Sequence, residues 1–431
     1  MKRALLLGAG FSYDLGMPLS SELTEVLLGM FTEKSTATLV ALLAAQKPFG
    51  DNRPVNRQAI EEAFALLLQY KADKGTNYEE FLTRIQEGSE RYGGDRSQSD
   101  RDSYHFVFSV LYDLVHTILS LYQAFAYEVL YPKNQQWFSK IENMLSGQDE
   151  TWVVSLNHDL FFECLAIDHG IPITYGANGA RSFPVSNLAM HDQISFSVID
   201  RATYGADSPE FLHGQRGINL VKLHGSLTEH HYGDGEEILN PSLKVESSRQ
   251  LMNDFHRIQG MAYFYQGRPV PSGRERAITG QDGELDLISK AILTGGRKYS
   301  VVAKASEGEE KLAIFDDVLK NVDHLTIMGY GFGDRHVNFR LQNAMARRDA
   351  LVIQLVDPGH SRLPDCLAPF DYDSRVLRAL CGAAHWLDYC RTKQWNPEQM
   401  NSLKKNSAFR TVVRQKVEDA IRAGKPNTTA A

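Results

Sequence analysis

The chain has 431 residues, enough for a large core and for two compact units with an appendage. Hydrophobic residues make up 43% of it and charged residues 23%, as in an ordinary soluble globular enzyme. The formal net charge of −7 argues against a whole-surface electrostatic grip on nucleic acid, so no direct nucleic-acid binding is predicted.

The cysteines are too far apart to suggest a bound metal. None belongs to a C-x-x-C pair: Cys164, Cys366, Cys381 and Cys390. This spacing favours reduced, structural thiols over a disulfide framework or a zinc ribbon.

Neither the start of the chain nor its longest apolar stretch indicates a membrane. The apolar run before Gly8 is too short for the core of a signal peptide. The stretch 106–131 contains Asp113, His116 and Glu128, which favours a buried helix over a membrane span. We therefore expect a cytoplasmic protein that does not bind membranes.

Short apolar runs alternate with helical or loop-rich sequence along the chain. They lie at 3–7, 151–156, 218–223, 325–328 and 351–356. Nearly continuous apolar strands are typical of a parallel sheet covered by helices. The sequence thus predicts an α/β fold with a Rossmann-like parallel sheet.

The turn after the first of these strands suits a nucleotide phosphate. Gly8-Ala9-Gly10 lets the backbone approach a phosphate closely, because it carries almost no side chain. Tyr13 stands where the usual dinucleotide fingerprint has its third glycine, and Gly16 follows instead. A helix is expected next, with Ser20 and Ser21 at its cap.

Between about 31 and 150 the pattern changes to apolar residues three and four apart, without a strand signal. We predict an all-helical insertion domain at 31–150, within a nucleotide-binding domain formed by 1–30 and 151–393. The remainder, 394–431, is predicted to hold a helix over 398–423 and a disordered polar tail.

Polar residues follow the second and third strands. Asn157 and Asp159 come directly after 151–156, where an N-x-D sequence taken alone is most often an Asx turn. His224 follows 218–223; it could accept a proton from water or from a ribose hydroxyl, or be a satisfied core histidine. His230-His231 lack a third ligand at metal-binding spacing, so we expect them at the surface and predict no metal.

Residues 228–320 are harder to interpret. Loops are expected at 233–237 and 267–276. Basic residues are frequent between 249 and 304, which could mark a surface for a partner or a phosphate. The simpler interpretation, a solvated face of an insertion, is favoured.

The last two strands are again followed by residues suited to a nucleotide. The run from Gly329 to Asn338 reads G-Y-G-F-G-D-R-H-V-N. Asp357, after 351–356, is positioned to accept hydrogen bonds from a ribose.

Four segments, starting at Gly8, Ser155, Leu223 and Gly329, together resemble a known family. They correspond to the sirtuin patterns G-A-G-x-S-x-x-x-G-[I/M]-P, T-x-N-x-D and H-G, and to a G-[Y/T]-[G/S]-F-x-D-x-H-x-N run of the prokaryotic branch. Over 1–30 and 150–370 the chain is similar to the sirtuin-like NAD-consuming domain of bacterial antiphage defence proteins.

The resemblance implies roles for individual residues. Asn157 and Asp159 would orient the ribose and stabilise the cationic transition state, and His224 would be the catalytic base. Asp334 and Asn338 would order their loop. The residues implied to bind NAD are Gly8, Ala9, Gly10, Ser12, Gly16, Gly225, Gly329, Gly331, Asp334 and Asp357.

Two departures separate the chain from sirtuins that deacetylate proteins. The two zinc-binding C-x-x-C pairs are missing, and Leu19-Ser20-Ser21 replaces aspartate-phenylalanine-arginine. The resemblance therefore implies an NAD⁺ glycohydrolase that releases nicotinamide and ADP-ribose as an antiphage effector, with NAD as substrate. A protein deacylase or ADP-ribosyltransferase, and an NAD- or ADP-ribose-binding assembly module without turnover, remain alternatives. Because a toxic hydrolase must be restrained, we also predict a homo-oligomer or a partner that controls the protein. The resemblance implies a HerA-type hexameric ATPase as that partner.

Overall fold

The centre of the molecule is a parallel sheet. The structure, a computed structural model, describes residues 2–45, 55–90, 97–292, 308–359, 362–372 and 374–424. Seven strands lie in the order β15-β14-β13-β1-β2-β6-β3, and every neighbouring pair is parallel. Their bounds are Arg3–Leu7 (β1), Glu150–Ser155 (β2), Ile173–Thr174 (β3), Gly217–Lys222 (β6), His324–Met328 (β13), Val352–Val356 (β14) and Val376–Ala379 (β15). The predicted Rossmann-like α/β class is confirmed.

The strand order creates a switch point beside β1. From β1 the sheet grows outward through β2 and β6, then returns to β13 on the other side of β1 and continues to β14 and β15. This is the order of a doubly wound dinucleotide-binding sheet, with the short β3 added at one edge. In such sheets ligands bind at the carboxyl ends of the strands where the order reverses. Here that point lies between β1 and β13.

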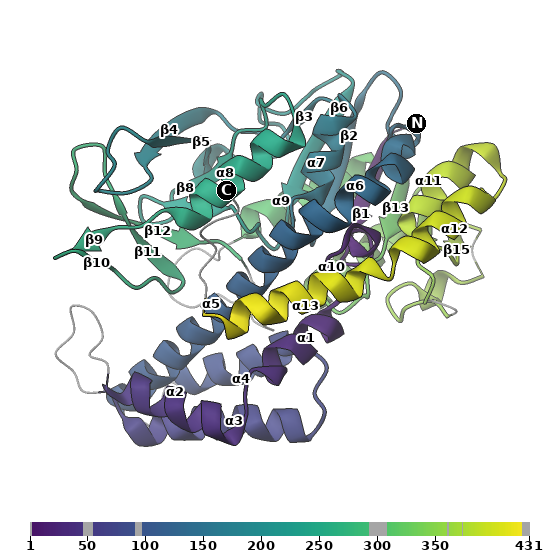
Figure 1. The fold of residues 1–431 in the computed structure, drawn as a ribbon. Helices are drawn as coiled ribbons and strands as arrows, with labels where there is room; N and C mark the ends of the chain where they lie inside the picture. The colour runs from purple at the N-terminus through teal and green to yellow at the C-terminus, as the bar shows by residue number, and fades with distance from the viewer. Residues whose placement is uncertain are drawn as a thin grey trace.

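Helices cover the sheet, as its apolar strands require (Figure 1). Strand β6 is buried along its whole length, and four of the five residues of β1 are buried. The helices of this part are α1 Ser20–Gly29, α7 Phe161–Asp168, α8 Ser248–Gly260, α9 Glu309–Asn321, α10 Arg335–Arg347 and α11 Ala383–Thr392, with 3₁₀ turns η1 Tyr13–Leu15, η3 Arg201–Thr203 and η4 Ala368–Phe370.

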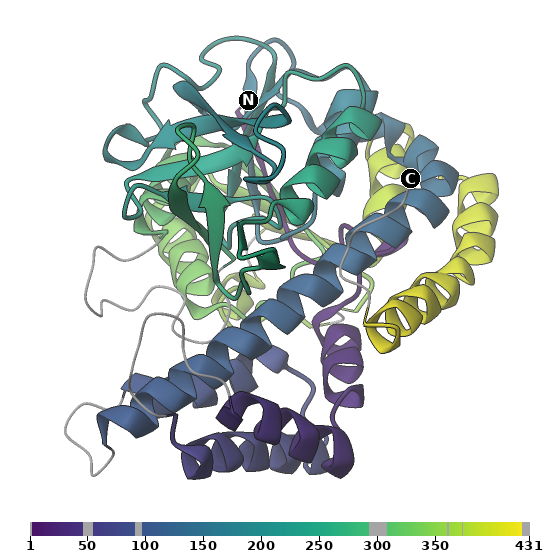
Figure 2. The same cartoon turned by 60° about the vertical axis from the view of Figure 1, so that its left-hand side comes forward.

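A helical region separates β1 from β2 in the chain. It comprises α2 Glu33–Ala45, α3 Arg57–Ala72, α4 Tyr78–Glu90, α5 Gln98–Val129, α6 Tyr131–Asn134 and the 3₁₀ segment η2 Gln135–Met144. Helix α5 starts at a capping box, in which Ser97 Oγ accepts from the Asp100 amide and Asp100 Oδ2 from the Ser97 amide. It runs from the bundle of α2, α3 and α4 to the sheet (Figures 1 and 2).

The length and composition of α5 would also suit a membrane span. Helices α1 and α2, which are bent against each other, would also be long and apolar enough if the two formed one span. In α5, 61% of the most apolar window is buried inside the molecule, as expected of a core helix.

A second, antiparallel sheet was not predicted. Its order is β11-β12-β7-β8-β5-β4, formed by Gly179–Pro184 (β4), Gln193–Asp200 (β5), His230–Tyr232 (β7), Glu237–Pro241 (β8), Glu275–Thr279 (β11) and Leu285–Lys290 (β12). It encloses a small core of its own that includes Phe183, Phe196 and Ile288. A two-stranded ribbon, β9 Phe264–Tyr265 and β10 Arg268–Pro269, lies between β8 and β11 in the sequence.

Several expectations for this part were wrong. The predicted loop at 267–276 contains β10 and the start of β11. His230 and His231, expected at the surface, are buried, because β7 is an inner strand of the second sheet.

The predicted helix ends also need correction. Helix α1 is capped by the Glu22 carboxylate, which accepts from the Leu19 amide at 2.9 Å, so Ser20 is its first residue and not its cap. The single helix expected over 398–423 is two, α12 Pro397–Asn406 and α13 Phe409–Arg422. The predicted disordered tail lies outside the described residues from 425 onward.

We predict that His230 makes folding stability depend on pH. Burial, with a smaller contribution from Arg276, lowers the pKa of His230 from 6.5 to about 3. As the pH falls below 6.5, the unfolded chain takes up this proton before the folded chain does, so stability decreases down to about pH 3. His230→Gln should remove about 2 kcal/mol of the stability lost between pH 7 and pH 5.

Urea unfolding of both proteins at the two pH values measures this. The exposed histidine variant His191→Gln is the control, which should keep the wild-type pH dependence. Equal pH dependence in His230→Gln and wild type would contradict the prediction.

Candidate active site

Two glycine-rich turns meet at the switch point. The Gly8 amide donates to the Met328 carbonyl at 3.0 Å, and the Gly10 amide to the Gly329 carbonyl at 2.9 Å. A Cβ on Gly10 would lie 2.7 Å from Gly329 Cα, and one on Gly329 would lie 2.4 Å from Gly10 C. The turns after β1 and β13 therefore pack backbone against backbone, which only glycine permits.

Asn157, after β2, is fixed by the turn after β1. Its Nδ2 donates to the Gly8 carbonyl at 2.9 Å and to Ser12 Oγ at 3.2 Å. Both amide hydrogens are thus used within the described part of the protein, and Oδ1 remains as the atom that can accept from a ligand. The side chain is buried and lines a cavity.

Asp159 is held by the same serine. Its Oδ1 accepts from Ser12 Oγ at 3.0 Å and from the Phe161 amide at 3.0 Å, which is an Asx turn at the start of α7. Burial raises the pKa of Asp159, while Lys222 and these two hydrogen bonds act in the opposite direction. Asp159 therefore forms an Asx turn and also lines the cavity.

His224, after β6, pairs with Asp334, which precedes α10. His224 Nε2 lies 2.8 Å from Asp334 Oδ2, and both side chains are almost fully buried. Asp334 Oδ1 accepts from the His336 and Val337 amides and so caps α10. Because a carboxylate only accepts, His224 donates from Nε2, and in the neutral ring the lone pair is on Nδ1.

The loop that carries Asp334 is ordered by its neighbours. The Tyr330 hydroxyl accepts from the Asp334 amide at 3.2 Å and lies 2.9 Å from Asn338 Oδ1. Asn338 Nδ2 donates to the Phe332 carbonyl at 2.8 Å. The carboxylate that orients His224 is therefore itself held by the loop that follows β13.

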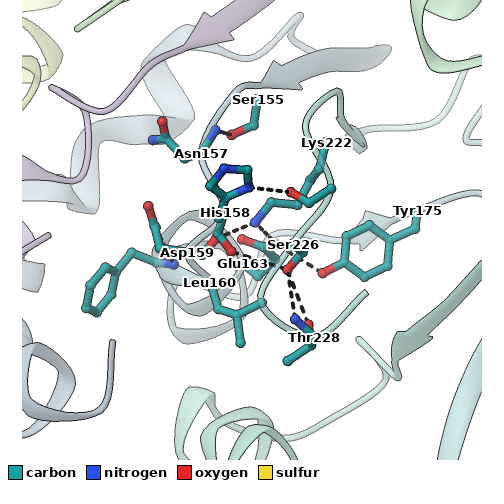
Figure 3. A network of polar contacts seen from close by, with 12 residues as sticks. Ser155, Asn157, His158, Asp159, Leu160, Glu163, Tyr175, Lys222, Ser226 and Thr228 are labelled. Carbon is teal, nitrogen blue, oxygen red and sulfur yellow. Dashed lines mark hydrogen bonds and ion pairs between the residues drawn. The ribbon is translucent and has the colours of Figure 1, made fainter. Parts of the chain in front are cut away.

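A buried ion pair under Asp159 was missed by the sequence analysis. Lys222 Nζ donates to the Asp159 carbonyl and lies 2.7 Å from Glu163 Oε1, which also accepts from the Tyr175 hydroxyl at 3.0 Å (Figure 3). Figure 3 shows this network behind the segment that carries Asn157 and Asp159. A lysine that ends an otherwise mostly apolar strand was the only available signal.

Asn157, Asp159, His224 and Asp334 line one cavity of about 310 Å³. It is lined by Gly8, Ala9, Met17, Pro18, Ser20, Leu23, Asn77, Tyr78, Glu79, Leu119, Leu156, Asn157, His158, Asp159, His224, Tyr330, Gly331, Gly333 and Asp334. All four sequence segments contribute to this lining. So does the start of α4, with Asn77, Tyr78 and Glu79, which the sequence did not indicate.

The remaining candidate residues do not line this cavity. Gly10, Ser12 and Gly329 form the layer beneath the lining. Gly16 packs on Ala126 of α5, and Gly225 packs against Ala291. Asp357 accepts from the Gly359 amide at 2.7 Å. Among the described residues there is no group of three or more histidine, cysteine or acidic side chains arranged for a metal.

Comparisons with known proteins give weak likenesses only. No protein-family model matches the chain, and no curated protein matches it. Among solved structures, a Sir2 homologue in complex with NAD is 12% identical, with a TM-score of 0.35 over 94% of this chain and 90% of the other. A mutant Sir2 homologue with 2′-O-acetyl ADP-ribose is 13% identical, with a TM-score of 0.35 over 94% and 92%. Sir2Tm bound to a propionylated peptide is 11% identical, with a TM-score of 0.32 over 91% and 92%. These identities and TM-scores are too low to support a conclusion about function. The strand order and the geometry of the site are the stronger observations.

The contact of the two turns gives a second prediction. Gly10→Ala should lower the free energy of unfolding by roughly 1–3 kcal/mol, because its Cβ overlaps the Gly329 backbone. Gly333→Ala, where a Cβ meets open space, is the matched control and should change it by about 0.5 kcal/mol or less. Urea unfolding measures both; equal effects of the two substitutions would show that the turns can separate without cost.

Proposed function

We propose that this protein hydrolyses the bond between nicotinamide and ribose in NAD⁺, releasing nicotinamide and ADP-ribose. The observation that carries the proposal is the meeting of Asn157, Asp159 and the His224–Asp334 pair in one cavity at the switch point of a dinucleotide-type sheet. The sequence resemblance to sirtuin-like NAD-consuming domains supports the choice of NAD⁺.

The proposed reaction uses groups with defined hydrogen-bond roles. The electron pair of the C1′–N bond leaves with nicotinamide, and positive charge develops on the ribose. The Asn157 Oδ1 and the Asp159 carboxylate stabilise this charge more strongly in the transition state than in the ground state. Water forms the new bond to C1′, and its proton passes to Nδ1 of His224. Asp334 stabilises the resulting imidazolium through Nε2.

We predict that the His224–Asp334 pair is needed for turnover. His224→Ala should slow NAD⁺ consumption by roughly 10²–10⁴-fold, because the base is lost. Asp334→Asn can keep the cap of α10, but an amide N–H directed at Nε2 favours the opposite tautomer and removes the lone pair from Nδ1. We expect a loss of a similar size and a changed pH–rate profile.

Chromatography of NAD⁺ and its products measures these rates. His191→Ala, at an exposed position, is the matched control and should retain the wild-type rate. Wild-type rates in both His224→Ala and Asn157→Ala would refute the site assignment.

A further prediction separates hydrolysis from the alternative activities. Purified protein given NAD⁺ alone should produce nicotinamide and ADP-ribose in equal amounts, since water is the only acceptor. A requirement for an acylated peptide, or ADP-ribose attached to protein, would instead indicate a deacylase or an ADP-ribosyltransferase. Calorimetric binding of NAD⁺ without turnover would indicate a binding module.

We further propose that the cellular role is depletion of NAD⁺ as an antiphage effector, within the cytoplasm. A destructive hydrolase needs restraint, so a homo-oligomer or a HerA-type hexameric ATPase is proposed to control it. Both proposals rest on the family resemblance. Light scattering of the protein with and without a HerA-type ATPase tests assembly. Phage protection that persists in His224→Ala would refute the effector role.

A further inference from the structure

A second cavity lies on helix α5, apart from the candidate active site. It has a volume of about 360 Å³, within the range of small-molecule sites. Its polar lining comes from α5, α8, the segment before β11, and β11 and β12: Asp113, His116, Thr117, Gln259, Ser272, Arg276 and Lys290. Helix α5 contributes to both cavities, since Leu119 lines the first and His116 the second.

The cations of this cavity exceed its anions. Arg276 is 6% exposed and Lys290 is 2% exposed. Asp113, which pairs with Lys290, is the one carboxylate among the described lining residues. Burial, together with the charges of Lys290 and Arg276, lowers the pKa of His116 well below its usual value, so His116 is neutral at pH 7. Among the described lining residues, one buried positive charge therefore has no counter-charge.

Arg276 also has unused hydrogen-bonding capacity. Nη1 donates to the Ile258 carbonyl, whereas the buried Nε has no acceptor among the described residues. A buried guanidinium without a full set of acceptors costs free energy, which an anion in the cavity would offset. The planar fork of arginine matches phosphate oxygens, and lysine adds a point charge.

We infer that this second cavity is a binding site for the phosphate group of a small anion. Arg276 and Lys290 bind the phosphate oxygens, and Ser272 lies at the exposed side of the same cavity. The basic stretch that the sequence analysis interpreted as a solvated face thus includes two buried side chains that line a positively charged cavity.

The second cavity is joined to the loop that carries His224. The Leu227 carbonyl accepts from Gln259 Nε2 at 2.9 Å and lies 3.3 Å from His116 Nε2. The Leu227 amide donates to the His158 carbonyl at 2.9 Å, between Asn157 and Asp159. A ligand that shifts His116 or Gln259 therefore acts on the segment beside the catalytic groups.

Strand β12 provides a second connection. The Ala291 amide, next to Lys290, donates to the Glu229 carbonyl at 3.1 Å. Gly225, next to His224, packs so tightly on Ala291 that a Cβ there would lie 1.8 Å from the Ala291 oxygen. Binding at Lys290 therefore changes the rate of the first site; this effect rests on the proposed NAD⁺ hydrolysis, whereas binding itself does not.

Calorimetry with inorganic pyrophosphate and inorganic phosphate tests binding. Ser272→Glu places a negative charge at an exposed position of the lining, where the fold tolerates it, and should weaken binding at least 10-fold. Asp113→Asn removes the competing carboxylate and should strengthen binding several-fold. Arg268→Gln, at an exposed position on β10, is the control and should bind as wild type does. The first site could bind the same anions, but it would not respond to these changes.

No binding by the wild-type protein, or equal affinity in wild type, Ser272→Glu and Asp113→Asn, would overturn the inference. The rate of NAD⁺ consumption with and without pyrophosphate tests the coupling: a change of at least 3-fold in wild type, absent in Ser272→Glu, is expected. Binding without any such change overturns the coupling alone. If no NAD⁺ is consumed under either condition, the proposed function fails while the binding result stands.

Discussion

The site depends on the contact between the turn after β1 and the turn after β13. These are the two strands between which the sheet reverses its order, and their carboxyl ends would normally leave a crevice. Gly10 and Gly329 bring the two backbones together beneath it, with hydrogen bonds from Gly8 to Met328 and from Gly10 to Gly329. The two packed turns therefore close the crevice at its base. Asn157 and His224, which follow β2 and β6, line the cavity above this base.

Polar contacts then link these strand ends into one unit. Ser12 lies between Asn157 and Asp159, and Asp334 reaches from the start of α10 to His224. Under this layer Lys222 joins β6 to the Asp159 carbonyl, with Glu163 of α7 as its counter-charge. Because an unpaired buried charge is costly, this pair resists separation of β6 from α7. The orientation of Asn157, Asp159 and His224, the proposed catalytic residues, thus follows from backbone packing and buried charge.

The sequence predicted the five inner strands of the large sheet because they are mostly apolar and each ends in a glycine or polar segment. It did not predict the short edge strands β3 and β15. It could not predict the pairing of His224 with Asp334, since they are 110 positions apart and a carboxylate beside a glycine run has several common roles. The antiparallel sheet was missed because β7 is only three residues long and begins with His230-His231, which suggest a polar surface. Arg276 and Lys290 were misjudged for a related reason: a basic residue is usually exposed, and only the three-dimensional structure reveals that these are buried.

Two elements distant in sequence from the strand ends support the site. The Tyr78 amide, at the start of α4, donates to Thr24 Oγ1 of α1 at 2.9 Å, which holds the helical region against the cavity. From the other end of the chain, Arg410 of α13 lies over the Tyr13 ring at 3.4 Å, donates to the Met17 carbonyl at 3.1 Å and pairs with Glu22 at 2.7 Å. Met17 lines the cavity, so α13 holds the first turn in place although it contributes no lining residue. The helical region and the C-terminal helix therefore both help to hold the segments that line the cavity.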